Sequence, residues 1–170
     1  MFKSTIFRTF AAASLALSLA ACGGDAPEEA TTAAPEAPAG IAVSDGWMAL
    51  PAVAGNPGAV YFTIKNDSDK QATIRSAYVQ GAESAMMHET AEWSGQVDMQ
   101  ELISQPVMAG ESVTFEPGGK HVMAMNLDGA LAEGGETEVT LTFAGGDKVS
   151  FPVAIYAAGK MPEKAEAAAE

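Results

Sequence analysis

Apolar and polar residues alternate in short runs through the middle of this chain, and clusters of Gly, Pro, Asn, Asp and Ser separate the runs. Alternation with a period of two is typical of strands that bury one face, whereas no long stretch repeats at the helical period of about 3.6 residues. Short strands at intervals of roughly ten residues predict an all-β domain, an antiparallel sandwich or barrel. The clearest expected strands are residues 59–64, 72–79, 112–115, 138–143 and 149–156.

The two ends of the chain lack this alternation. At the N-terminus, Lys3 and Arg8 precede an apolar stretch that is too short to span a bilayer stably, which is the form of a cleaved secretory signal. The segment after it is rich in Ala, Pro, Glu and Thr, a composition typical of disorder. We therefore expect a signal peptide at 1–21, a disordered tether at 22–40, one β-domain at 41–157 and a flexible acidic tail at 158–170.

The residues from Leu19 to Cys22 have the form of a lipobox, the signal at which a bacterial lipoprotein is cleaved and acylated on its cysteine. Cys22 is the only cysteine, so its acylation would leave no free thiol and no disulfide within the chain. The alternative is an ordinary signal peptide with a chance cysteine. We expect a periplasmic protein held to a membrane by lipid on Cys22. Because Gly23 rather than Asp follows the cysteine, the outer membrane is slightly favoured.

The charge of the chain is strongly acidic. Two of its nine basic residues lie in the expected signal, which leaves seven against 22 acidic residues and a formal charge of −15. Nucleic acid is excluded as a partner, since phosphate binding needs a basic surface, and so is docking on anionic lipid by charge. A basic protein partner and a merely solvated acidic surface both agree with this charge.

His88 and His121 are the only histidines, and each has a methionine at a spacing that strands can bring close: Met99 and Met123. Imidazole and thioether donors form a soft ligand set, which favours Cu(I) over harder cations. Because successive side chains of a strand point to opposite faces, His121 and Met123 would project from the same face. The four side chains therefore predict one site for a single Cu(I) ion.

A hairpin is expected to bring His88 and Met99 together. Residues 85–91 and 96–103 look like its strands, and symmetry about the Trp93–Ser94 bond would make His88 and Met99 a direct cross-strand pair. Both ligand pairs would then converge at one end of the sandwich.

Three further methionines are not assigned as ligands. Met86 shares the face of His88 and would flank the ion, and Met161 in the tail would offer a loose thioether. Met125, further along the strand of His121 and Met123, is expected to pack in the core.

The spacing His-x10-Met-x21-His-x-Met resembles that of the periplasmic copper chaperones associated with the Cu-A centre of cytochrome c oxidase, the PCu(A)C family. The segment Gly119–Met123 is similar to the family's Gly-x-His-Val-Met stretch, and Gly58–Asn66 to its Ala-Tyr-Phe-x-Ile-x-Asn strand. The resemblance extends over about Trp47–Tyr156. One departure is Met48-Ala49, where many relatives have an Arg shortly after the equivalent of Trp47, and this affects partner docking or local packing rather than the ligands.

The resemblance implies a cupredoxin-like Greek-key β-sandwich. It implies that one Cu(I) ion is bound by the four predicted ligands and passed to the Cu-A site of cytochrome c oxidase or to another copper chaperone. It also implies a protein that is not an enzyme.

Other functions are less compatible with the residues present. A blue-copper electron carrier needs a Cys thiolate beside two His, and the only cysteine lies at the processing site. No Ser-His-Asp arrangement, His-Glu-x-x-His motif or Gly-rich phosphate loop indicates an enzyme. Two alternatives stay open: a copper-buffering or resistance protein with the same site, and a metal-free β-sandwich lipoprotein.

Overall fold

The computed structural model describes residues 37–93 and 96–166. The predicted signal peptide, Cys22 and most of the predicted tether lie outside the described residues, as do the last four residues of the predicted tail. The described residues belong to one compact unit. Among them, no helix has the length and apolar character needed to cross a membrane.

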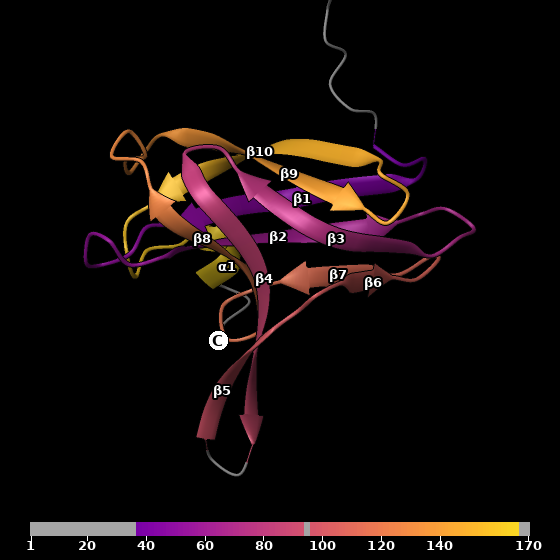
Figure 1. Cartoon of the computed structure of the whole chain (residues 1–170), viewed down its shortest axis with the longest axis horizontal. Helices are drawn as coiled ribbons and strands as arrows, with labels where there is room; N and C mark the ends of the chain where they lie inside the picture. Colours follow the sequence, from indigo (N-terminus) through magenta and orange to yellow (C-terminus); the bar gives the residue numbers. More distant parts are fainter. Residues whose placement is uncertain (1–36, 94–95, 167–170) are drawn as a thin grey trace, which may run out of the picture. The chain divides into compact units, whose positions relative to one another are not determined.

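Strands make up nearly all of the regular structure in the described ranges (Figure 1). This confirms the all-β class, and each of the five clearest expected strands is present. The elements are β1 (Ile41–Ala49), β2 (Gly58–Asn66), β3 (Ala72–Val79), β4 (Ala82–Trp93), β5 (Gln96–Glu101), β6 (Gln105–Val107), β7 (Ser112–Phe115), β8 (Lys120–Leu127), β9 (Glu136–Phe143), β10 (Lys148–Tyr156) and the single-turn helix α1 (Glu163–Glu166).

In β1, apolar and polar residues do not alternate regularly, and a bulge explains why. The pairing of β1 with β2 shifts register between Ser44 and Trp47, and Asp45 has a positive φ of 56°. Such a bulge inserts residues that break the period of two, so a pattern search does not mark the strand.

The strands hydrogen-bond in the order β5-β4-β8-β2-β1-β10-β9-β3-β6, and β7 pairs with β2. The pairs in the described ranges are antiparallel except that β1 and β10 run parallel, which is a local departure from the expected antiparallel architecture. A connection of only Gln80 and Gly81 joins β3 to β4, which are far apart in the strand order, and these two strands are in contact. The sheet therefore curves around a core.

The core is lined by alternate residues of the strands. Phe62 stacks on Phe115 with ring centroids 4.4 Å apart, and Phe151 lies 5.2 Å from Phe62. On β4 and β8 the core side is taken by Met87, Val122 and other buried residues. The residues between them must point to the opposite, outer face of the sheet.

Met125 lies on this outer face of β8. It is half-buried, pairs with Ser84 of β4 and is not part of the core cluster, so the prediction that it packs in the core is wrong. The reason is the alternation itself, because Val122 and Ala124 already occupy the inward positions of the strand.

Asn66 is a buried polar residue at the end of β2 that fastens two neighbouring segments. Its amide donates to the carbonyls of Lys70 at 2.7 Å and Val107 at 3.0 Å. Its side-chain oxygen accepts hydrogen bonds from the backbone N–H of Ser68 at 3.1 Å and from that residue's hydroxyl at 2.6 Å. The loop after β2 is thereby tied to β6, and every polar atom of the buried amide has a partner.

We expect Asn66→Leu to lower the free energy of unfolding by about 2–4 kcal/mol, because two carbonyls lose their buried donor. Denaturant unfolding of the mature chain without its lipid measures this. As a control, Asp67→Ala removes an exposed ion pair with Lys65 of 2.8 Å and should cost less than about 1 kcal/mol. Equal losses in the two variants would contradict the role assigned to Asn66.

Candidate metal centre

The two histidines of the chain face each other on neighbouring strands. His88 of β4 is the direct register partner of His121 of β8. Their ring centroids are 5.9 Å apart, and the ring planes are inclined at 65°. Residues directly opposite in an antiparallel pair lie on the same face, so β pairing alone brings both imidazoles to one place.

A second pair of soft side chains occupies the next position of the same ladder. Met86 of β4 is the register partner of Met123 of β8, two residues along from the histidines on each strand. Both methionines are half-buried. The shared face of His121 and Met123 agrees with the prediction, and it is the face opposite Val122.

The hairpin of β4 and β5 has a different register from the predicted one. His88 pairs with Glu101, and Met99 pairs with Thr90, so the prediction that His88 and Met99 face each other directly is wrong. The strands run to Trp93 and from Gln96, which centres the hairpin on residues 94–95, one residue later than expected. Two-residue connections that contain Gly are common in hairpins, whereas the strands expected from the sequence left a four-residue connection at 92–95.

Met99 keeps the same face of the hairpin as His88 but lies diagonally from it. Thr90 is two residues from His88 on β4, so its partner Met99 lies on the same side. The side chain of Met99 is 47% exposed. Figure 1 shows β5 and the end of β4 extending beyond the other labelled strands, which is where this methionine lies.

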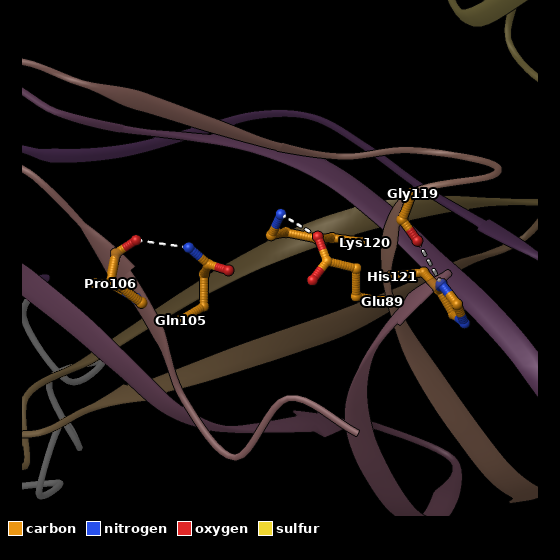
Figure 2. Close-up of polar contacts among 6 residues, drawn as sticks. All are labelled: Glu89, Gln105, Pro106, Gly119, Lys120 and His121. Atoms are coloured by element: carbon orange, nitrogen blue, oxygen red, sulfur yellow. Dashed lines mark hydrogen bonds and ion pairs between the residues drawn. The ribbon is translucent and has the colours of Figure 1, made fainter. Parts of the chain in front are cut away.

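The ring nitrogens of His121 have unequal surroundings. Its Nδ1 lies 3.1 Å from the carbonyl oxygen of Gly119, and the residue is only 6% exposed. The Nδ1–H tautomer donates this bond, and the other ring nitrogen points away from the carbonyl (Figure 2). A backbone carbonyl that fixes the ring and its tautomer is typical of a metal-binding histidine. In His121, Nε2 is then the nitrogen that would bind the metal.

His88 has a buried nitrogen with no partner. Within the described ranges, its Nδ1 is the buried side-chain nitrogen or oxygen that makes no hydrogen bond. Leaving such an atom unpaired costs about 1–3 kcal/mol, and a bound ion would remove that cost. The residues present therefore fit a metal better than they fit an empty site.

The flanks of the histidine pair are an ion pair and a row of aromatic rings. Lys120 donates to Glu89 at 2.6 Å and joins β8 to β4 next to the histidines (Figure 2). On the other side, the ring of Tyr61 lies 6.4 Å from that of His121 and 4.5 Å from that of Trp47. Burial raises the pKa of the Tyr61 hydroxyl further above neutrality, and the phenol beside the site is uncharged at physiological pH.

The donor set selects the class of metal. The described residues contain no group of three or more His, Cys, Asp or Glu side chains that could hold an ion. Two imidazoles and neighbouring thioethers remain as donors, and this soft set suits Cu(I) rather than Ca²⁺ or Mg²⁺, which take oxygen ligands.

Two features of the site were missed by sequence reasoning: the direct pairing of the histidines and the pairing of Met86 with Met123. A signal for both exists. Met86-x-His88 and His121-x-Met123 are mirror images, and antiparallel neighbours with mirrored sequences bring His opposite His and Met opposite Met.

Comparison with known proteins identifies the family. The family described as "Putative lipoprotein LpqE-like" matches residues 41–155. A relative from Leifsonia xyli subsp. xyli (strain CTCB07), named "Putative lipoprotein Lxx21020", is 32% identical over 157 residues, which cover 91% of this chain and 92% of the relative.

Solved structures give the fold. The copper-bound PCuAC domain from PmoF2 is 20% identical with a TM-score of 0.59, over 72% of this chain and 97% of that domain. The apo PCuAC domain from PmoF1 is 24% identical with a TM-score of 0.55, over 69% and 94%. PCuAC domains are cupredoxin-like, which confirms the expected fold class. The chain therefore belongs to the LpqE-like lipoprotein family, and its domain has the PCuAC fold that the His and Met spacing indicated.

Proposed function

We propose that this chain is a metallochaperone that binds one Cu(I) ion outside the cytoplasm. The observation that carries the proposal is the pairing of His88 with His121 beside Met123, on the outer face of β4 and β8. The proposed ligands are these three residues and Met99. The copper-bound structure of a PCuAC domain with the same fold supports copper as the cargo.

The chemistry of the ligands suits a cargo that must be released. Thioethers carry no charge and do not titrate near neutral pH, so they compete with no proton for the ion. A site without thiolates binds Cu(I) less tightly than one with them, which favours transfer. Met99 is the most exposed of the proposed ligands, so a recipient can displace it first.

The proposed location follows from Cys22 and from the lipoprotein family. Lipid on Cys22 would anchor the chain to a membrane outside the cytoplasm. An anchored chain would share its compartment with a membrane-bound recipient. The proposed recipients are the Cu-A subunit of cytochrome c oxidase and another copper chaperone. A buffering protein would use the same site, and only the recipient separates the two functions.

Loss of a ligand should weaken copper binding. In an anaerobic competition titration of the mature chain with a Cu(I) chelator, we expect one tight site. We expect the affinity to fall at least about tenfold in His88→Ala and Met123→Ala, since loss of even an outer partner of a metal ligand costs about 10- to 100-fold. Met108→Ala is the matched control, because Met108 is as exposed as Met99 but lies outside the site. Equal binding in all four proteins would reject the site.

Transfer distinguishes delivery from buffering. The copper-loaded mature chain is mixed with an apo Cu-A fragment of an oxidase, the two proteins are separated by charge, and the copper content of each is measured. A chaperone should lose its copper to the fragment, faster than free Cu(I) is released to solution. Copper that stays with the acidic chain would favour buffering.

A further inference from the structure

Four soft side chains form a compact rectangle on the outer face of the sheet. The pairs His88–His121 and Met86–Met123 are successive positions of one ladder that share a face. Opposite Cα atoms are about 4.5–5.5 Å apart, and residues two apart on a strand about 6.6 Å. The corners therefore lie about 4 Å from the centre of the rectangle, within reach of an imidazole nitrogen or a thioether sulfur for an ion above the sheet.

Met99 has a less direct approach to the same centre. Its strand, β5, lies on the side of β4 away from β8, so two strand spacings, about 9–10 Å, separate it from the strand of His121 and Met123. It is also displaced toward the hairpin tip, opposite Thr90. From this position, its thioether would have to extend past His88 to reach an ion above the rectangle.

Packing offers no other role for Met86 and Met123. Neither belongs to the core cluster or to the partly buried apolar residues packed against it. The neighbouring Met87, which points inward, fills the core with 3% exposure. Both methionines are half-buried beside the two histidines and lie outside the core. This position suits a metal ligand better than a residue that fills space in the core.

We propose that Met86 is a copper ligand. Together with His88, His121 and Met123 it forms an inner site, and Met99 is an outer ligand that exchanges with Met86 when copper enters or leaves. This inference rests on the proposed function and adds a fifth donor to it. A half-buried thioether loses less rotational freedom on binding than the exposed one, so the inner site holds the ion at rest.

The test compares leucine variants, because leucine keeps most of the volume of methionine and removes the sulfur. Met86→Leu, Met99→Leu and the control Met108→Leu are titrated with Cu(I) against a chelator under anaerobic conditions. The parent is also labelled with ¹³C on its methionine methyl groups and followed by NMR during the titration. Circular dichroism verifies that each variant is folded.

We expect Met86→Leu to lower the Cu(I) affinity at least about tenfold and Met99→Leu to lower it less, while Met108→Leu leaves it unchanged. The methyl resonances of Met86 and Met123 should shift on binding, and they should shift more than the methyl resonance of Met99.

Parental affinity in Met86→Leu with an unmoved Met86 methyl resonance would overturn this inference. The proposed function would stand in that case if His88→Ala still lost its copper. A larger loss in Met99→Leu than in Met86→Leu would overturn the order of the inner and outer ligands. A parent chain that binds no Cu(I) would reject the proposed function and this inference together.

Discussion

The site depends on the register of β4 against β8. Only that register places His88 opposite His121, and a slip of one residue would turn either histidine toward the core. Burial of Met87 and Val122 in the core fixes this register. The ion pair of Glu89 and Lys120 adds a further contact between the two strands. The hydrophobic core thus sets the geometry of polar groups that do not belong to it.

Separation of the two faces has a functional benefit. The inward residues of β4 and β8 determine stability, while the outward ones are free to carry donors with little effect on packing. His121 is both packed and able to bind a metal. It is almost fully buried, and after its hydrogen bond to Gly119 one ring nitrogen is still available. A ring held in this way needs little reorganisation when an ion binds.

The sequence predicted the fold class and the shared faces because both follow from local alternation. It did not reveal β1, whose bulge near Asp45 interrupts the period of two. It placed the hairpin of Met99 one residue too early, since the register depends on a turn whose length the flanking strands do not specify. The meeting of His88 and His121 joins residues far apart in the chain, and periodicity gives the face of a residue but not its partner strand.

The bulged strand β1 also separates the first residues of the domain from the candidate metal centre. Trp47, near the C-terminal end of β1, lies in line with Tyr61 and His121, whereas the chain enters the domain at Ile41, about 20 Å away along the strand. Residues 37–40 thus lead into β1 at the end of the strand that is remote from the imidazoles. A protein that contacted the proposed donors would therefore meet a surface formed by β2, β4 and β8, and not the start of β1.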